Sequence, residues 1–172
     1  MKKKYLKNLI IASMMAFAVA SCLNIDDDEK VYSAAQEKLE RGAYLDSLQA
    51  KGHDIDTTEL GVYYIVIEEG EGDFARAGDT LTVGYAGYFI DETLFDASDI
   101  HYPDGKMEFV LENPPMIPGW DDGMKVMNKN ARVQFIVPSE LAYGSEGRGA
   151  IPPYQTLIFV VKMFDIKPAD SN

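Results

Sequence analysis

From Gly61 onward the apolar positions alternate with polar ones, a pattern typical of strands that bury one face. The clearest case is residues 80–90, where Leu81, Val83 and Tyr85 fall on one face and Thr80 and Thr82 on the other. Similar patterns occur at residues 62–68, 107–112, 132–137 and 156–166. We therefore expect one antiparallel sheet of five or six strands in this half of the chain.

A single segment breaks this alternation. In residues 118–128, four residues recur at helical spacing: Trp120, Gly123, Met124 and Met127. A glycine inside a helix costs about 1 kcal/mol, which is tolerable where the helix must lie very close to a sheet. The sequence therefore predicts an α+β fold, with the antiparallel sheet curled as a half-barrel around one short helix.

Residues 31–50 precede the sheet and have the spacing of an amphipathic helix, although Gly42 weakens the pattern and Gly52 is a stop signal. Residues 53–58 are polar and predict a linker. Three roles remain open for this N-terminal helix. It packs on the sheet domain, it pairs with a second copy to form a dimer, or it spaces the domain from a membrane.

The first residues have the organisation of a secretory signal peptide. Residues 1–7 hold four lysines and no acid, and residues 9–20 are apolar or small without interruption. That run is too short to span a bilayer, which needs about 20 apolar residues. We predict a signal peptide over residues 1–21, with residues 22–30 as an acidic tether.

Cys22, the only cysteine, ends the sequence Val-Ala-Ser-Cys, which resembles a bacterial lipobox. The resemblance implies that Cys22 carries lipid, palmitate included, and anchors the chain to a membrane. The alternative is a small buried hydrophobic residue, as free cysteines often are. Leu23 follows, where aspartate would resemble an inner-membrane retention signal. We therefore expect a protein of the cell envelope on the outer membrane, at its periplasmic face or on the cell surface.

The charge of the chain excludes some partners. The full sequence holds 16 basic and 28 acidic residues, and removal of residues 1–21 takes away four lysines and no acids. So acidic a protein lacks the basic face that nucleic-acid binding requires. It also gains nothing from electrostatic attraction to anionic lipid, so the lipid on Cys22 would have to provide the anchor.

Residues 140–159 contain a Tyr-Gly corner, a glycine-rich loop and an Ile-Pro-Pro step that leads into an apolar strand. The glycines permit backbone angles closed to other residues, and the two prolines stiffen the exit. The hydroxyl of Tyr143 and the apolar Ile151 and Phe159 then come to the rim of one sheet. This arrangement favours a small apolar ligand held against the sheet and oriented by one hydroxyl.

Six fragments in chain order carry a resemblance: Val-Gly-Tyr-Ala-Gly at 83–87, Thr-Leu-Phe-Asp-Ala-Ser at 93–98, Met-Ile-Pro-Gly-Trp at 116–120, Leu-Ala-Tyr-Gly at 141–144, Ile-Pro-Pro at 151–153 and Thr-Leu-Ile-Phe at 156–159. Together they resemble the FKBP-type peptidyl-prolyl cis/trans isomerases over residues 59–168, which leaves 169–172 as a tail. The resemblance implies an enzyme that rotates X–Pro bonds in exported proteins. Its partners would be proline-containing polypeptides and tacrolimus-like ligands, and it would use no cofactor and no metal.

The resemblance also implies the site. Its catalytic residues would be Tyr85, Phe95, Asp96, Ile117, Trp120, Tyr143 and Phe159, and the substrate would also contact Met107, Met116 and Ile151. Trp120 would form the floor, the N–H of Ile117 and the hydroxyl of Tyr143 would bind substrate carbonyls, and Asp96 would act at a polar edge through Tyr85. Met107 and Met116 depart from the usual phenylalanine and valine. Arg148 replaces a less basic loop residue.

The residues themselves leave alternatives open. Spacing alone favours a core role for Tyr85, Phe95 and Phe159, and only the joint order of the motifs favours a pocket. The chain has two histidines, His53 and His101, in polar segments far apart, which is little material for a catalytic triad or a zinc site. A non-catalytic module that docks envelope partners is the main rival function, and a holdase chaperone is a weaker one.

Overall fold

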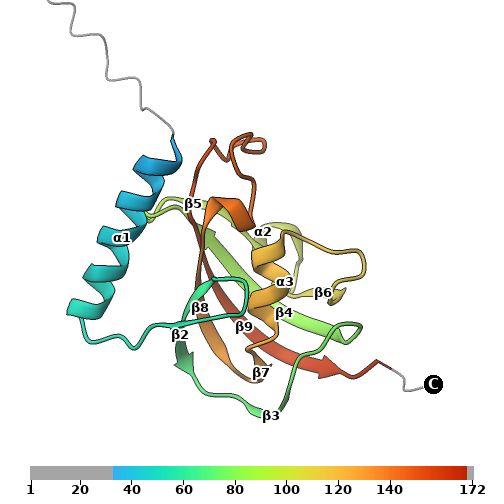
Figure 1. Cartoon of the computed structure of the whole chain (residues 1–172). Helices are drawn as coiled ribbons and strands as arrows, with labels where there is room; N and C mark the ends of the chain where they lie inside the picture. Colours follow the sequence, from blue (N-terminus) through green and yellow to red (C-terminus); the bar gives the residue numbers. More distant parts are fainter. Residues whose placement is uncertain (1–32, 170–172) are drawn as a thin grey trace, which may run out of the picture. The chain divides into compact units, whose positions relative to one another are not determined.

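A computed structural model describes residues 33–169 of the chain (Figure 1). In chain order the elements are α1 (Ala34–Ala50), β1 (Asp56–Thr57), β2 (Tyr63–Glu68), β3 (Glu71–Phe74), β4 (Thr80–Tyr88), β5 (Leu94–Ala97), α2 (Ser98–His101), β6 (Met107–Val110), α3 (Pro118–Met124), β7 (Asn128–Lys129), β8 (Arg132–Val137), the 3₁₀ turn η1 (Ser139–Leu141) and β9 (Leu157–Lys167). The predicted signal peptide, Cys22, the acidic tether and residues 170–172 of the tail lie outside the described residues.

The main sheet is antiparallel, with strand order β1-β2-β8-β9-β4-β5, and β6 also pairs with β4. Seven strands of the described chain belong to it, while β3 and β7 form a separate two-stranded ladder. Two strands of this sheet lie outside the five predicted ranges. One is β5, and the other is β1, which is only two residues long and lies in the segment expected to be a linker. The α+β architecture expected from the sequence is confirmed.

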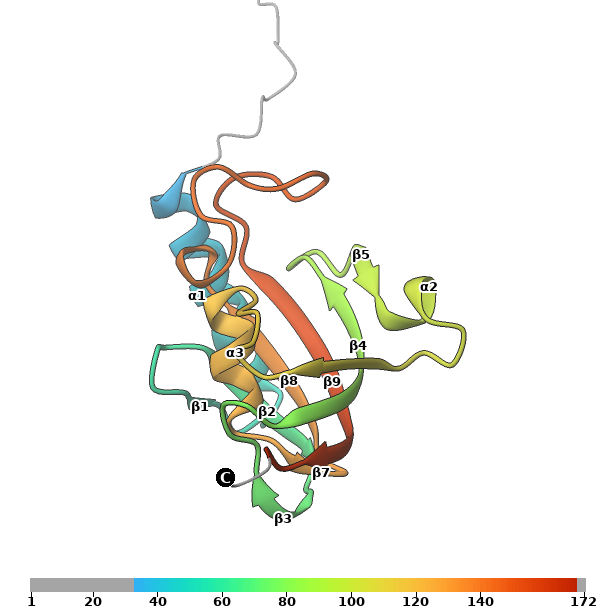
Figure 2. The same ribbon diagram turned by 90° about the vertical axis from the view of Figure 1, so that its right-hand side faces the viewer.

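The longest ladder joins β4 to β9, from Thr80 opposite Lys167 to Tyr88 opposite Ile158. Its register shifts between Thr82 and Val83, and an irregularity of this kind increases the local bend and twist of a strand. The sheet curls, and α3 lies against its inner face (Figure 2). The main core fills the space between them, and Leu81, Val83, Met124 and Phe135 in it are fully or almost fully buried.

Helix α3 lies very close to β8, which is the condition under which a glycine at position 123 is tolerable. A Cβ atom on Gly123 would lie 3.1 Å from the ring of Phe135, and one on Gly119 only 2.3 Å from Cγ1 of Val137. The helix ends at Met124, earlier than the apolar spacing predicts. Met127 N–H bonds back to the Met124 carbonyl at 3.0 Å, so the chain continues as a tighter turn.

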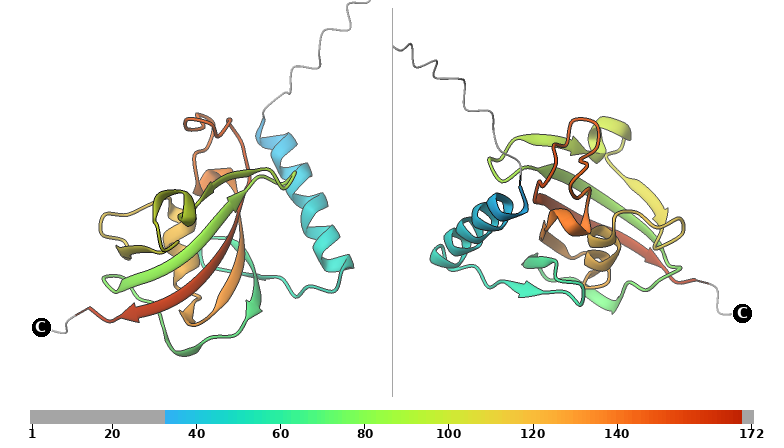
Figure 3. Two further views of the ribbon diagram at one scale, coloured as in Figure 1. Left: turned by 180° about the vertical axis from the view of Figure 1, so that it is seen from behind. Right: turned by 45° about the horizontal axis from the view of Figure 1, so that its top comes forward.

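Helix α1 packs on the sheet domain and covers the face of β8 opposite to α3. Leu48 of α1 forms a second small core with Ile65 and Ile136, while Phe135, the neighbour of Ile136 in β8, points into the main core. Figure 3 shows α1 running beside β8 and β9. Of the three roles left open by the sequence, packing on the domain is therefore observed, and the other two stay predictions.

Both ends of α1 have recognisable signals. Ser33 caps the first turn by accepting a hydrogen bond from Gln36 N–H at 3.2 Å, so the helix begins three residues later than predicted. Gly52 follows the end with a φ of 86°, the left-handed conformation that glycine adopts readily. Within the described residues, no helix combines the length and the apolar character needed to cross a bilayer.

Candidate active site

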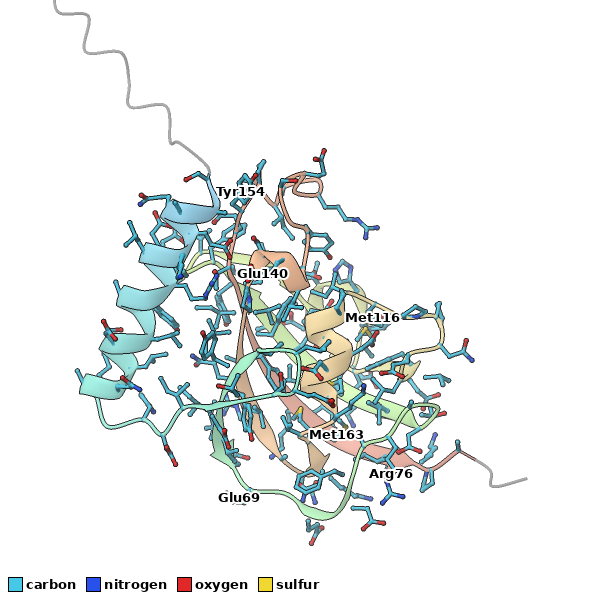
Figure 4. All side chains as sticks on the ribbon, viewed as in Figure 1. Glu69, Arg76, Met116, Glu140, Tyr154 and Met163 are labelled. Atoms are coloured by element: carbon cyan, nitrogen blue, oxygen red, sulfur yellow. The ribbon has the colours of Figure 1, made fainter. Side chains whose placement is uncertain are left out.

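A cavity of about 580 Å³ opens at the inner face of the sheet, beside α3. It is bounded by side chains from β4, β5, β6, the N-terminal end of α3, the loop after β8, and β9. Figure 4 labels Met116, which lies at the α3 side of this cavity. The lining residues are Tyr85, Asp96, Met107, Pro115, Met116, Ile117, Pro118, Trp120, Ala142, Tyr143, Arg148 and Phe159.

Trp120, which is 5% exposed, forms the aromatic floor of the cavity. Its ring centroid lies 5.4 Å from that of Tyr85 and 5.3 Å from that of Phe159, with interplanar angles of 79° and 81°. Edge-to-face contacts of this kind are favourable because the ring quadrupoles complement each other. The indole is therefore held in one orientation by rings from β4 and β9.

Phe95 does not line the cavity but supports its wall from behind. Its ring lies 5.7 Å from that of Phe159 and 5.0 Å from that of Phe89. The Phe95 ring has space because residue 87 is glycine. A Cβ atom on Gly87 would come within 2.7 Å of the Phe95 ring and 3.0 Å of the Phe159 ring. The glycine in the Val-Gly-Tyr-Ala-Gly motif thus lets these rings pack against the sheet.

The polar edge of the cavity is a short hydrogen-bonded chain. The Tyr85 hydroxyl donates to Oδ2 of Asp96 at 2.9 Å, and Oδ1 of Asp96 lies 2.6 Å from Nε2 of His101. Burial, and then the nearby Asp96 carboxylate, raise the pKa of Tyr85 above its usual range. The phenol therefore keeps its proton at neutral pH and serves as a fixed donor to Asp96.

Sequence reasoning missed His101, which it placed among unrelated polar residues. His101 is the last residue of α2, five positions after Asp96, and this one-turn helix brings its ring back to the carboxylate. The available signal was the short spacing between an acid assigned to the site and one of only two histidines in the chain.

Residues that line the cavity carry hydrogen-bond donors without a partner among the described residues. These include the backbone N–H of Ile117, the hydroxyl of Tyr143 and the indole N–H of Trp120. The loop before α3 is fixed by Asp121, whose Oδ2 accepts from Met116 N–H at 2.9 Å. Burial raises the pKa of the Asp121 carboxyl, and the Met116 N–H bond opposes that rise. The Ile117 N–H is thus presented by a constrained backbone.

The glycine-rich loop that carries Tyr143 is tied at several points. Gly144 N–H donates to the Ser139 carbonyl at 2.8 Å, and the Gly144 carbonyl accepts from Tyr154 N–H at 2.8 Å. Gly147 has a φ of 67°, and a Cβ atom there would lie 2.4 Å from the Ile151 carbonyl oxygen. Ile151 packs against the main core and lies outside the cavity lining. The loop is therefore ordered around the cavity by its own backbone.

Three residues differ from those usual in the family that the sequence resembles: Met107, Met116 and Arg148. Of these, Arg148 changes the charge at the rim of the cavity. Its guanidinium carbon lies 5.7 Å from the centroid of the Tyr143 ring, within the range of a cation–π contact. It adds a cation to a cavity whose other charged lining residue is Asp96.

Known proteins show the same fold and sequence features. Residues 71–164 match the family FKBP-type peptidyl-prolyl cis-trans isomerase, more than half of the chain. The chain belongs to this family. The FKBP-type peptidyl-prolyl cis-trans isomerase FkpA of Escherichia coli is 35% identical over 181 residues, covering 95% of this chain and 65% of that protein. A probable FKBP-type isomerase of Haemophilus influenzae is 37% identical over 141 residues, covering 81% of this chain and 56% of that one.

Solved FKBP-type structures have a similar fold. The crystal structure of FkpA from Escherichia coli superposes with a TM-score of 0.67 at 35% identity, covering 79% of this chain and 62% of that one. A peptidyl-prolyl cis-trans isomerase from Pseudomonas syringae pv. tomato gives 0.65 at 27% identity, covering 78% of this chain and 95% of that one. The chain spans just under two thirds of the length of FkpA.

A second cavity of about 580 Å³ lies along β4, β5 and β9, and Glu68, Asp99, Arg132 and Lys162 are among its lining residues. The second cavity lacks Trp120 and the donors of Ile117 and Tyr143, so we assign no catalytic role to it although it has the same volume as the first. No cluster of three or more potential metal-ligating residues occurs in the described part of this FKBP-type chain.

Proposed function

We propose that this chain catalyses cis/trans isomerisation of X–Pro bonds in polypeptides, acting on exported proteins in the cell envelope. The observation that carries the proposal is the cavity itself. It combines an aromatic floor, Trp120 between Tyr85 and Phe159, with two unpartnered donors, Ile117 N–H and the Tyr143 hydroxyl. An apolar cup with a few converging polar groups is the usual form of a site for a small apolar group such as a prolyl ring.

The chemistry needs neither a nucleophile nor a metal. Rotation about a peptide bond faces a barrier of about 18–20 kcal/mol because the planar amide loses resonance as it twists. Water stabilises the polar planar form more than the twisted form, so a dry aromatic cavity lowers the cost of the twist. The Ile117 N–H and the Tyr143 hydroxyl would hold the substrate carbonyls while the amide rotates. Interactions that are stronger in the twisted state are the ones that increase the rate.

Asp96 contributes through the groups that it holds. Its carboxylate accepts from the Tyr85 hydroxyl at 2.9 Å and from Ala97 N–H at 2.9 Å, so it fixes the phenol ring against Trp120. Hydrogen bonds to a charged acceptor are worth about 1.5–3 kcal/mol. A carboxylate in this position keeps the polar edge of the cavity ordered without exposing an unpaired charge to the prolyl ring.

The first prediction concerns the floor and the polar edge. Trp120→Ala removes most of the apolar contact with the prolyl ring, and Asp96→Ala frees the Tyr85 hydroxyl. Each change should lower kcat/KM for a short proline peptide by about tenfold or more, since the loss of a buried apolar contact and the loss of a bond to a charged group each cost at least about 1.5 kcal/mol. The measurement is the isomerisation rate with the full chain, alongside circular dichroism to verify the fold.

Asp73→Ala is the matched control, because it removes an exposed carboxylate on β3, outside the cavity lining. If Trp120→Ala and Asp96→Ala both retain the full rate, the assigned site is wrong. If the wild-type chain binds tacrolimus but does not accelerate isomerisation, the rival function stands and the protein is a binding module with an FKBP-type fold. Inhibition by tacrolimus would support the enzyme.

We further propose that Cys22 carries lipid and anchors the chain to the outer membrane. The support is sequence alone: a short apolar run, a lipobox-like Val-Ala-Ser-Cys, and an acidic remainder that has no attraction for anionic lipid. Cys22→Ala should move the protein from the membrane fraction to the soluble fraction, as judged by fractionation and immunoblotting. Asn24→Ala is the control and should stay with the membranes. Persistent membrane association of Cys22→Ala would refute the anchor.

A further inference from the structure

Glu37 of helix α1 is a buried carboxylate, 4% exposed, far in sequence from the cavity residues. Its Oε1 accepts from Ser139 N–H at 2.7 Å, from the Thr156 hydroxyl at 2.7 Å and from Arg41 at 2.9 Å. Its Oε2 accepts from the Ser139 hydroxyl. A single side chain of the N-terminal helix thus receives hydrogen bonds from two points 17 residues apart in the domain.

These two points are the ends of the loop that carries Tyr143. Ser139 begins η1, and its carbonyl accepts from Gly144 N–H at 2.8 Å, next to Tyr143. Thr156 stands immediately before β9, three residues ahead of Phe159. Figure 4 labels Glu140 in η1 and Tyr154 near the other end of the loop. Glu37 therefore binds the entry and the exit of the segment that presents a donor and a wall of the cavity.

The burial of a charge here requires compensation, and the structure supplies it. An isolated buried carboxylate is strongly unfavourable, but this one has Arg41 one turn along the helix, and Arg41 is only 11% exposed. The Arg41 guanidinium also donates to the Thr156 hydroxyl at 3.3 Å. Apart from Glu37, Ser139 N–H has no acceptor among the described residues. Removal of Glu37 would leave that buried donor unsatisfied.

We propose that Glu37 is a positioning residue for the isomerase site. Through Glu37, helix α1 would hold the loop that carries Tyr143 in the conformation that binds substrate. The proposal rests on the proposed function, because it assigns Glu37 a role in the placement of the Tyr143 hydroxyl and the Phe159 ring. The carboxylate fixes both ends of residues 139–156, so the loop keeps one conformation when the cavity is empty. A preordered loop binds substrate without first losing conformational freedom.

A residue that only stabilised the fold would give a different kinetic result. Loss of stability lowers the fraction of active enzyme, which lowers the observed kcat and leaves KM unchanged. Displacement of Tyr143 and Phe159 weakens contacts to bound substrate, which raises KM. The separation of KM from kcat therefore distinguishes positioning from general support.

The experiment compares three full-chain variants. Glu37→Ala removes all the acceptors. Glu37→Gln is the conservative rescue, because its amide oxygen can keep the three bonds to Oε1 while its amide N–H₂ donates to the Ser139 hydroxyl. Glu40→Ala is the matched control, since the Glu40 carboxylate accepts a hydrogen bond from Gln36 of the same helix at 3.0 Å and none from the Tyr143 loop among the described residues.

We expect Glu37→Ala to raise KM for a proline peptide by about tenfold, within the range that a small misplacement of binding groups causes. Glu37→Gln should stay within about threefold of wild type and Glu40→Ala should match it. Tacrolimus affinity, followed by the fluorescence of Trp120, the only tryptophan, should weaken in parallel. Hydrogen exchange should increase in residues 139–155 and remain unchanged in β4.

An unchanged KM together with unchanged exchange in residues 139–155 would overturn the proposal. So would an equal increase of exchange throughout the domain, which would indicate general destabilisation. If the wild-type chain shows no isomerase activity, the proposed function fails, and the exchange and tacrolimus data alone decide whether Glu37 orders the loop.

Discussion

Single glycines set how closely α3 approaches the sheet, and the site depends on that distance. Gly119 stands next to Trp120, and a Cβ atom there would lie 2.3 Å from Val137 Cγ1 and 3.1 Å from the Leu141 carbonyl oxygen. Side-chain atoms can shift, but the Leu141 backbone belongs to the η1 turn just before Tyr143. The methyl group of an alanine at position 119 would therefore displace both Trp120 and the loop that carries Tyr143.

We predict that Gly119→Ala lowers the free energy of unfolding by about 1–3 kcal/mol, the usual cost of overpacking a tight core. Urea denaturation measures it. Gly42→Ala is the matched control, because a Cβ atom at Gly42 meets nothing within 4 Å. There the same change should raise stability by about 0.5–1 kcal/mol, since alanine is the better helix former. Equal effects at the two positions would contradict the role of close packing.

At the scale of elements, the sequence predicts strands that are long enough to show alternating apolar residues, and it misses strands of two residues. Strand β8 occupies residues 132–137 as predicted, because every second side chain of a half-buried strand must be apolar. Strands β1 and β7 have two residues each, too few for any alternation to be visible. The packing of α1 was equally hidden, since an amphipathic pattern reveals an apolar face but not what covers it.

The candidate site was predictable to a similar degree. Eight of the ten site residues implied by the family resemblance line one cavity, and Phe95 and Ile151 support it from outside the lining. Those assignments came from motif order, because spacing alone favoured a core role for the aromatic residues. Contacts formed through tertiary structure had no comparable signal. Glu37 lies 102 residues from Ser139, and nothing in a local pattern connects them.

The whole molecule is strongly acidic, with a formal charge of −12. Several ion pairs join acids and bases on the surface of the described residues. Glu68 contacts Lys162 at 2.5 Å, with Arg132 at 3.7 Å, and Asp165 contacts Lys129 at 2.8 Å. The hydrogen bond from Lys162 lowers the pKa of Glu68 below its usual 4.5, and the bond from Lys129 lowers that of Asp165 below 3.8. Such pairs connect β8 and β9 to neighbouring strands at the surface.

The sign of their effect on stability follows from proton linkage. A carboxyl with a lowered pKa in the folded state binds fewer protons there than in the unfolded chain. Its contribution to stability is therefore present above the unfolded pKa, near pH 4.5 for Glu68, and is lost as the pH falls through the lowered value.

We predict that Glu68→Gln makes the decline of unfolding free energy below pH 4.5 shallower, with a small effect at pH 7 because exposed pairs contribute little. Urea titrations between pH 2.5 and 7 measure this slope without screening the pair, with Glu69→Gln as the adjacent control. An identical acid slope in Glu68→Gln and wild type would exclude the Lys162 pair as a source of acid sensitivity.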